Sequence, residues 1–351
     1  MSATDPGADA VVTASDDAPV PIPAPFAQAL RELNLAGAEP LTGCPLTGGV
    51  SSDIWRIDTP RGSLCAKRAL PKLRVAADWR APIERNLYEA RWMRVANEAV
   101  PGCAPQVIGQ HPALGVLVMK YLPPSDYRLW KQLLRDGHAD AATARGVGCA
   151  LAHIHAYSAA RPDLAAQFPT DAIFFDIRLE PYLLATARRH PELAAALERL
   201  VTVTQANRVA LVHGDVSPKN ILIGPHGPLF LDAECAWWGD PAFDIAFCLN
   251  HLLLKCLWNP PATDAFLTAF DVLAAAYLQT VGWEPRAALE QRAAALLPGL
   301  FLARVDGKSP VEYLTDNVQR DAVRRVAGAL LRRPVDRLAA VAARWREELA
   351  S

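Results

Sequence analysis

The chain has 351 residues and a formal net charge of −1 at pH 7, which allows one large or two moderate domains and excludes a global positive field that would recruit nucleic acid or an acidic membrane. Its seven cysteines include no Cys-x-x-Cys pair, which argues against a disulfide framework or a zinc site. We find no signal-peptide pattern and no run of about 18 uninterrupted apolar residues. These features predict a cytoplasmic globular protein that binds neither nucleic acid nor membrane.

The predicted elements divide the chain into a tail and two lobes. Residues 1–24 are rich in Ala, Asp and Pro and predict a disordered tail. Residues 25–122 are rich in short β-like runs, whereas residues 123–351 are mostly helical. The expected elements are a helix at 26–35, a hairpin at 45–58 and 62–70, a helix at 82–99, two strands at 106–122 and a hairpin at 220–234. This order indicates the α+β class, with a ligand cleft between the lobes.

The sequence TGGVSSDIW, near the start of the predicted hairpin, is a candidate phosphate-covering loop. Gly48 and Gly49 allow the backbone to approach a ligand closely, and the hydroxyls of Ser51 and Ser52 can bond phosphate oxygens. The same residues are also ordinary in turns. Since the chain contains no Gly-x-x-x-x-Gly-Lys-[Ser/Thr] motif, a Walker-type ATPase is disfavoured.

A lysine on the following predicted strand, Lys67 in SLCAKRAL, is a candidate cation for nucleotide phosphates. Its neighbour Arg68 fits an exposed strand position. Burying Lys67 requires a carboxylate partner, because an unpaired buried charge is strongly destabilising. Glu89 in NLYEARWM is the preferred partner. Glu84 is the alternative, about 140° around the same helix.

Two loops in the second lobe carry oxygen-bearing side chains at a joint spacing. Asp215 follows an apolar run, Asn220 lies five positions later, and Asp232 ends the predicted hairpin twelve positions beyond. Phosphoryl transfer from ATP needs a carboxylate to orient the attacking hydroxyl and oxygen ligands for magnesium. Asp215 and Asn220 could instead only cap a turn, but the joint spacing favours the catalytic and metal loops of a kinase fold.

The sequences HGDVSPKN and LDAECAWWGDPAFDIA make the chain resemble the aminoglycoside phosphotransferase/choline kinase superfamily over residues 40–260. The resemblance implies a bilobal protein-kinase-like fold that uses ATP and Mg²⁺. It implies that Asp215 is the catalytic base and that Asn220 and Asp232 bind the metal. It also implies a hinge at residues 119–122, where the backbone of Lys120 and Leu122 reads the adenine.

Other polar residues near these loops have less certain roles. Glu234 replaces the glycine of Asp-Phe-Gly, and it can join the metal shell, receive a substrate hydroxyl or pair with a Lys or Arg. We expect Asp240 and Asp244 to be mainly structural, and the resemblance implies that Asp244 braces the catalytic loop. We expect His213 to order that loop rather than to carry a proton.

Three stretches resemble methylthioribose kinases within the superfamily: the Asp-x-Glu motif, YLPPSDYRLWKQLL and ARVDGKSPVEYL. In that family an arginine of the last stretch contacts the sugar, which points to Arg304. Trp237 and Glu234 are further candidate substrate contacts. Asn220 departs from the family, which carries a serine there, and this departure leaves the substrate open while preserving the chemistry.

The remaining alternatives concern the acceptor and whether catalysis occurs at all. An aminoglycoside is a polycation and needs carboxylates, whereas residues 319–351 are rich in arginine, which favours a neutral or anionic hydroxylated small molecule. A protein kinase is disfavoured, because no Ala-Pro-Glu segment follows Asp232. A non-catalytic nucleotide-binding pseudokinase is disfavoured, because every group that the chemistry needs has a candidate.

Overall fold

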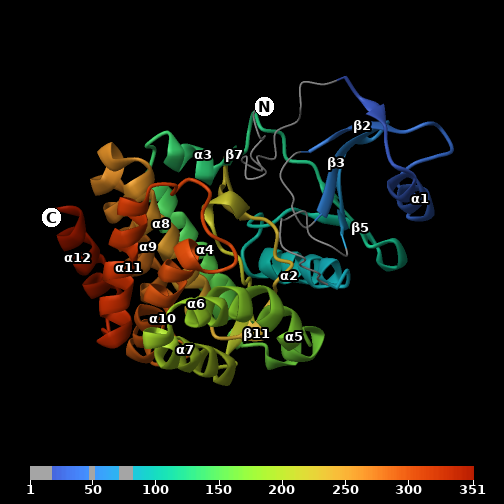
Figure 1. Ribbon diagram of the computed structural model, residues 1–351. Coiled ribbons are helices and arrows are strands. Elements are labelled where there is room, and N and C mark those ends of the chain that lie inside the picture. Colours follow the sequence, from blue (N-terminus) through green and yellow to red (C-terminus); the bar gives the residue numbers. More distant parts are fainter. Residues whose placement is uncertain (1–17, 47–51, 71–81) are drawn as a thin grey trace.

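Two lobes make up the computed structural model, which describes residues 18–46, 52–70 and 82–351. The N-terminal lobe contains a six-stranded antiparallel sheet, and the C-terminal lobe is mostly helical (Figure 1). The bilobal α+β architecture expected from the sequence is therefore confirmed. None of the helices described is long and apolar enough to cross a membrane.

The N-terminal sheet has the strand order β1-β2-β3-β4-β6-β5. Its elements are β1 (Val20–Pro21), α1 (Ala24–Glu32), β2 (Thr42–Pro45), β3 (Ser52–Thr59), β4 (Gly62–Ala69), α2 (Arg85–Ala99), β5 (Val107–His111), the short 3₁₀ helix η1 (Pro112–Leu114) and β6 (Val116–Lys120). Both predicted strand pairs and both predicted helices of this lobe are present. One boundary was wrong: β1 pairs with β2 and Ile22 is buried, so the lobe begins inside the predicted tail.

Strand alternation gives the N-terminal sheet two different faces. Val116 and Val118 of β6 pack with α1, whereas Leu117 and Met119 face the cluster that includes α2 and the C-terminal lobe. On β4, Ala66 belongs to the α1 side, so its neighbour Lys67 points to the opposite face, toward α2. The central position of β4, between β3 and β6, keeps Lys67 within a paired and rigid strand.

The C-terminal lobe packs its helices around one long buried helix, α8 (Ala242–Trp258), in which every residue from Ala242 to Cys256 is buried. The other elements are β7 (Arg128–Leu129), α3 (Trp130–Arg135), α4 (Ala141–Ala159), η2 (Pro162–Gln167), α5 (Asp171–Phe174), η3 (Phe175–Leu184), α6 (Ala185–Arg189), η4 (Pro191–Leu193), α7 (Ala194–Ala206), β8 (Ala210–Val212), η5 (Pro218–Asn220), β9 (Ile221–Gly224), β10 (Gly227–Phe230), β11 (Trp237–Gly239), η6 (Pro260–Ala262), α9 (Thr263–Thr280), α10 (Arg286–Asp306), α11 (Asn317–Arg332) and α12 (Leu338–Leu349).

Two small antiparallel sheets present the polar loops at the boundary between the lobes. One joins β11 to β8, and the other has the order β10-β9-β7. The β9–β10 hairpin turns at Gly224 and Gly227, as the sequence predicts. The loop after β8 carries Asp215 and the loop after β10 carries Asp232, so short strands fix both loops at their starts.

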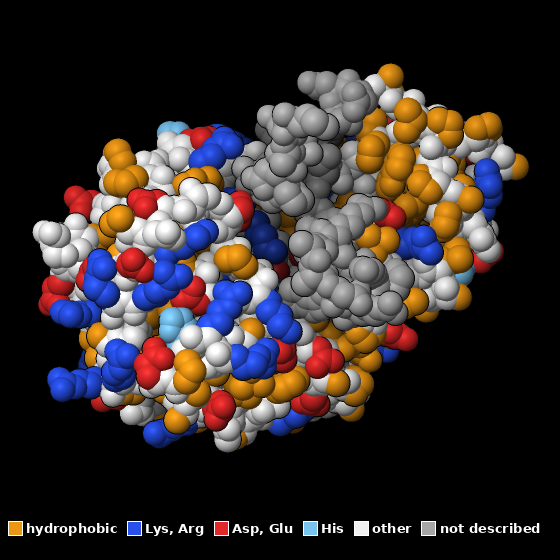
Figure 2. All heavy atoms as spheres, viewed as in Figure 1, with side chains coloured by type: hydrophobic (Ala, Val, Ile, Leu, Met, Phe, Trp, Pro, Cys, Tyr) orange, Lys and Arg blue, Asp and Glu red, His pale blue; other side chains and the backbone are white. Residues whose placement is uncertain are grey.

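The arginine-rich C-terminal helices lie on the side of the molecule away from the N-terminal sheet (Figure 1). Arg325 pairs with Glu348, Arg344 with Glu347 and Arg346 with Asp271. Figure 2 shows acidic and basic side chains interspersed over this lobe. These arginines form a solvated face, as expected, and their helices lie away from the N-terminal sheet. The count of charges in residues 319–351 therefore says nothing about the acceptor.

Candidate active site

The loop that carries Asp215 is fixed by a buried carboxylate beneath it. Asp244, at the start of α8, accepts hydrogen bonds from the backbone N–H groups of His213 (2.7 Å) and Gly214 (2.8 Å), and His155 Nε2 lies 3.2 Å away. Gly214 has φ +80°, and a Cβ there would lie 2.7 Å from the carbonyl oxygen of Cys235. Only glycine fits this turn without strain. The bracing role expected for Asp244 is confirmed.

His213 links the Asp215 loop to the Asp232 loop. Its Nδ1 accepts from the backbone N–H of Asp215 (3.1 Å), and its Nε2 lies 3.0 Å from the carbonyl oxygen of Leu231. A carbonyl only accepts, so Nε2 carries the proton and the ring is neutral. Burial lowers the pKa of His213, and the nearby charges of Asp244 and Asp215 only oppose this. The loop-ordering role predicted for His213 is confirmed.

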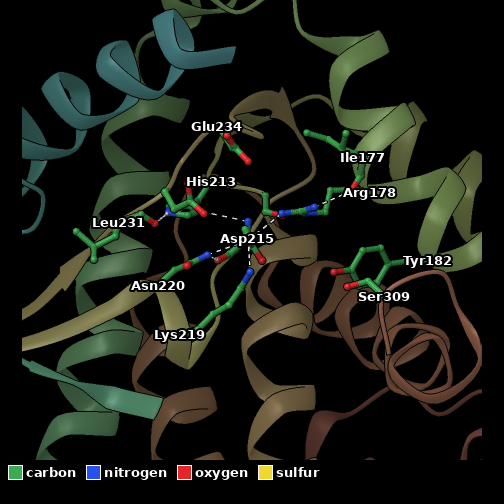
Figure 3. Close-up of polar contacts among 12 residues, drawn as sticks. Ile177, Arg178, Tyr182, His213, Asp215, Lys219, Asn220, Leu231, Glu234 and Ser309 are labelled. Carbon is green, nitrogen blue, oxygen red and sulfur yellow. Dashed lines mark hydrogen bonds and ion pairs between the residues drawn. The ribbon is translucent and has the colours of Figure 1, made fainter. Parts of the chain in front are cut away.

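Three side chains surround the Asp215 carboxylate from different directions (Figure 3). Asn220 Nδ2 donates to Asp215 Oδ2 at 2.8 Å and to the Asp215 carbonyl at 3.0 Å. Arg178 Nη2 lies 2.9 Å and Lys219 Nζ 3.3 Å from Oδ2. Arg178 also donates to the carbonyls of Gly214 and Ile177. Among the residues that the structure describes, the groups that hold this carboxylate all belong to the C-terminal lobe.

Asp232 occupies a strained backbone position and reaches across to the other lobe. Its φ is +64°, in the left-handed region that Asp tolerates better than most residues. Its carboxylate pairs with Lys67 Nζ, which also lies 2.9 Å from Glu89. The Lys67–Glu89 pair expected from the sequence is confirmed, and the alternative partner Glu84 is exposed.

The charges of this trio shift one another's pKa. Burial would lower the pKa of Lys67, but the charges of Asp232 and Glu89 outweigh it and raise the pKa. Burial would raise the pKa of Asp232, but Lys67 and Lys219 hold it well below its ordinary value. Burial raises the pKa of Glu89 against the opposing charge of Lys67. Lys67 and Asp232 are therefore charged at neutral pH.

Glu234, whose role the sequence left open, forms a second ion pair between the lobes. Its Oε2 lies 2.9 Å from Nε of Arg85, the first residue of α2. The Arg85 side chain is fully buried and also donates to the carbonyls of Pro82 (2.9 Å) and Leu70 (2.8 Å). Of the alternatives, pairing with an Arg or Lys is the one found.

The donor set around Asp215 and Asp232 suits a hard divalent cation. The Asn220 amide nitrogen is turned toward Asp215, which directs its carbonyl oxygen away from that residue. Asp232 adds a charged oxygen ligand whose side chain is 28% exposed. In the described part of the chain no group of three or more His, Cys, Asp or Glu side chains could hold a metal. Such sparse oxygen ligation fits Mg²⁺, which keeps waters and binds substrate phosphates.

The predicted nucleotide contacts are only partly covered by the described residues. Gly48, Gly49 and Ser51 lie outside them. Ser52 begins β3, is buried, and its hydroxyl has no hydrogen-bond partner among the described residues. At the hinge, the backbone N–H of Lys120 donates to Gln106 (2.9 Å) and is therefore occupied. This bond takes one backbone group of Lys120, and the base contacts expected of the Lys120 and Leu122 backbone stay predictions.

Leu122, the other predicted hinge residue, lies beside a small apolar cluster. It packs with Leu129, Leu222 and Leu229. These side chains come from the segment after the hinge and from the β9–β10 hairpin, so they bring both lobes to one apolar surface. Such a surface suits the face of a planar base.

The two remaining predicted substrate residues differ in their surroundings. Trp237 is buried, stacks on Phe174 with ring centroids 4.3 Å apart, and donates from its indole nitrogen to Asp171 (2.8 Å). Its side chain is engaged in packing, so the substrate contact expected of Trp237 finds no support. Arg304 donates to Tyr182 Oη (3.2 Å) and to Ser309 Oγ (3.0 Å). The guanidinium groups of Arg304 and Arg178 both contact the ring of Tyr182.

Sequence reasoning missed Arg178, Lys219 and Arg85. Arg178 lies in the π-helical segment η3, which contains Pro181, and wide turns of this kind are frequent at functional sites. The only signal was a single arginine within the apolar run FFDIRLEPYLL. For Lys219 the signal was its spacing: it lies four positions after Asp215, close enough in sequence for the two side chains to form an ion pair.

A family model described as "Phosphotransferase enzyme family" matches residues 42–289 of the chain. The chain belongs to this phosphotransferase enzyme family. Curated relatives include the methylthioribose kinases of Bacillus cereus (strain ZK / E33L), 26% identical over 235 residues, and of Cronobacter sakazakii (strain ATCC BAA-894), 27% identical over 228 residues. These matches cover 58% and 56% of this chain, and 58% and 55% of the relatives. The phosphotransferase thus spans little more than half the length of the curated relatives it matches.

Among solved structures, the phosphotransferase is similar to amicoumacin kinase hAmiN in complex with AMP-PNP, Ca²⁺ and Ami. The TM-score is 0.52 at 14% sequence identity, and the match covers 89% of this chain and 95% of that chain. At this identity the likeness establishes the fold, which is the kinase-like bilobal fold that the sequence predicts.

Proposed function

We propose that this phosphotransferase moves the γ-phosphoryl group of ATP to a hydroxyl of a small molecule, with Asp215 as the general base. The observation that carries the proposal is that neutral His213 links the Asp215 loop to the Asp232 loop. Asp215 supplies a fixed carboxylate, and Asp232 supplies a second carboxylate that pairs with Lys67 of the other lobe. Phosphoryl transfer needs this combination of a positioned base, oxygen ligands and a phosphate-binding cation.

In the proposed reaction Asp215 accepts the proton of the acceptor hydroxyl while that oxygen forms a bond to the γ-phosphorus. The bond from the γ-phosphorus to the β–γ bridging oxygen breaks, and ADP leaves. Arg178 and Asn220 keep the Asp215 carboxylate aimed throughout, because both contact it before any substrate binds. Positioning of this kind is the main contribution of such sites.

The nucleotide would lie between a lobe of residues 25–122 and a lobe of residues 123–351. Lys67, held by Glu89, would contact the phosphates, and Gly48, Gly49, Ser51 and Ser52 would cover them. Leu122 would contribute to the surface for the base. Asn220 and Asp232 would hold Mg²⁺, which neutralises charge on the phosphate oxygens. Glu234 stays a weaker candidate for the acceptor side.

The test is ADP release from ATP and Mg²⁺ with a panel of sugars, sugar acids, amino alcohols and aminoglycosides. Methylthioribose belongs in the panel because the curated relatives carry that name. We expect acceptor-dependent ADP release that Asp215→Asn abolishes and that Asp163→Asn, a change at an exposed ion pair with Arg161, leaves intact. Nucleotide binding without release for any acceptor would instead support a pseudokinase.

A further inference from the structure

Beyond Asp215, the C-terminal lobe contains a buried group of cationic and polar side chains that the proposed transfer step does not use. We call Arg304, His251, Lys255 and Tyr313 the basic subsite. Arg304 is 8%, His251 6% and Lys255 1% exposed. Lys255 Nζ lies 4.1 Å from the centre of the Tyr313 ring. Burial lowers the pKa of His251 well below its ordinary value, and the positive charges of Arg304 and Lys255 lower it further.

The basic subsite is connected to Asp215 through one tyrosine. The guanidinium carbons of Arg178 and Arg304 each lie 5.7 Å from the centre of the Tyr182 ring. Arg178 contacts Asp215, and Arg304 holds the Tyr182 hydroxyl. Figure 3 shows that hydroxyl directed toward the side on which the Asp215 carboxylate lies. Tyr182 thus lies between the arginine that contacts Asp215 and the arginine of the basic subsite.

Three buried polar atoms of the basic subsite have no hydrogen-bond partner among the described residues: Arg304 Nε, His251 Nε2 and Tyr313 Oη. A buried polar atom without a partner destabilises a protein, so native structures rarely retain one unless it serves a function. Arginine donates only, and a hydroxyl and a neutral imidazole can each donate one bond. Such a donor set matches a ligand rich in acceptor oxygens.

The nearby carboxylates do not balance this positive charge. Glu312 pairs with Lys131 at 2.6 Å, Asp306 pairs with Arg324 at 2.7 Å, and Asp215 is shared by Arg178 and Lys219. Next to burial, the largest effects that lower the pKa of His251 come from the positive charges of Arg304, Lys255, Lys219 and Lys131. The region beyond Asp215 is thus electropositive, which opposes a polycationic acceptor and favours an anionic one.

We propose that the acceptor carries an anionic group, a carboxylate or a phosphate, that binds at the basic subsite while its hydroxyl faces Asp215. The acceptor class is then a hydroxy acid or a phosphorylated polyol. This inference rests on the proposed phosphoryl transfer. Arg304 supplies the main contact, because guanidinium groups bind both kinds of oxyanion through paired hydrogen bonds.

Matched acceptors that differ only in the anionic group test this proposal. ADP release is measured with gluconate against glucitol and with ribose 5-phosphate against ribose, and the two arms distinguish a carboxylate from a phosphate. We expect kcat/KM for one anionic member to exceed that of its neutral partner by at least about 100-fold, because sites that leave buried donors unpaired without the right substrate discriminate by up to about 10⁴–10⁵-fold. Equal or better use of the neutral members would overturn the proposal and leave the phosphotransferase function standing.

Variants of the basic subsite give an independent readout. Arg304→Gln should raise KM for the preferred anionic acceptor about 100-fold, while the affinity for AMP-PNP changes less than about twofold. Arg188→Gln, at an exposed pair with Glu180, is the matched control and should change neither. An Arg304→Gln variant with unchanged KM would contradict the anionic contact.

Tyr313→Phe separates a ligand-binding role from a structural one. The hydroxyl has no described partner, so its removal should leave Tm unchanged or higher. KM for the anionic acceptor should nevertheless rise about fivefold, because one donor to the ligand is lost. A lower Tm with unchanged KM would show that the hydroxyl stabilises the fold, and it would overturn this part of the assignment.

Discussion

The Asp215 loop and the Asp232 loop carry similar carboxylates but hold them in different ways. The Asp215 side chain is 6% exposed, and its partners in the described part of the chain, Arg178, Lys219 and Asn220, all lie in the C-terminal lobe. The Asp232 side chain is 28% exposed and pairs with Lys67 from the other lobe. The contacts of Asp215, the proposed base, are therefore independent of the N-terminal lobe, whereas the contact of Asp232 with Lys67 requires it.

This difference separates two requirements of a phosphoryl-transfer site. Orientation of a base benefits from rigid hydrogen bonds made in advance, because a misplaced base loses most of its effect. A metal ligand must instead exchange partners when nucleotide and cation arrive, and a partly exposed carboxylate on a strained residue can do so. His213 connects the two loops, so a change in one is transmitted to the other through a single neutral ring.

The largest loss of stability is expected when Asp244, which accepts hydrogen bonds from the backbone of the Asp215 loop, is replaced. Asp244→Ala removes the acceptor of two backbone N–H groups and the partner of His155. The free energy of unfolding should fall by about 3–5 kcal/mol, the usual loss when one partner of a buried charged network is deleted. Chemical denaturation measures this. Asp271→Ala, which breaks an exposed pair with Arg346, should change it by less than about 1 kcal/mol, and equal losses would refute the bracing role.

Asp232→Asn tests the Asp232 loop while leaving the side chains that contact the Asp215 carboxylate unchanged. Asp232→Asn removes a charged oxygen ligand and the partner of Lys67 while preserving shape. We expect the activity to fall on the order of 100-fold, because preorganised charge at the transferring group is lost. The dependence of AMP-PNP binding on Mg²⁺ should weaken as well. Titration calorimetry with and without Mg²⁺ tests this, and an unchanged Mg²⁺ dependence would exclude Asp232 as a ligand.

The Arg178→Lys variant tests how strongly the activity depends on the orientation of Asp215, the proposed base. Arg178→Lys keeps the charge but loses the planar fork that spans Asp215 and the Gly214 carbonyl. We expect kcat to fall about tenfold, equivalent to about 1.4 kcal/mol, with the AMP-PNP affinity unchanged. Steady-state kinetics separate the two quantities. If the nucleotide affinity fell and kcat did not, Arg178 would belong to the nucleotide site.

The smallest effect concerns pH and the histidine that joins the loops. The folded protein keeps His213 neutral with a lowered pKa, while the unfolded chain binds a proton near pH 6.5. As pH falls below about 6.5 the unfolded state gains protons that the folded state does not, so stability is lost by about 1 kcal/mol per pH unit for this residue until the lowered pKa is reached. Unfolding curves of His213→Gln should be flatter over this window, whereas those of His226→Gln, at an exposed histidine, should match the parent protein.

Much of the site could be predicted because its signals are local. The Asp215–Asn220 spacing, the hairpin before Asp232 and the strand lysine each reside in one short segment with its own turn residues. Glu89 was preferred over Glu84 because it fits the spacing of the family that the chain resembles. The fold class followed from the same alternation of short strands and longer helices.

The remainder depended on tertiary packing that no segment encodes alone. Arg178 reaches Asp215 from 37 positions upstream, through π-helical turns that the periodicity does not reveal. Charge counting failed for the C-terminal arginines, since composition cannot tell which way a helix faces. Trp237 was assigned to the substrate, but its indole nitrogen already donates to Asp171.

The most direct test of the account is the turnover of Asp215→Asn with the best acceptor, measured alongside its affinity for AMP-PNP. Loss of a positioned general base predicts a fall in kcat of about 10²–10⁴-fold. The nucleotide affinity should stay within about twofold, because Asp232 and Lys67 are untouched. Turnover close to that of the parent protein would contradict the assignment of Asp215 as the base.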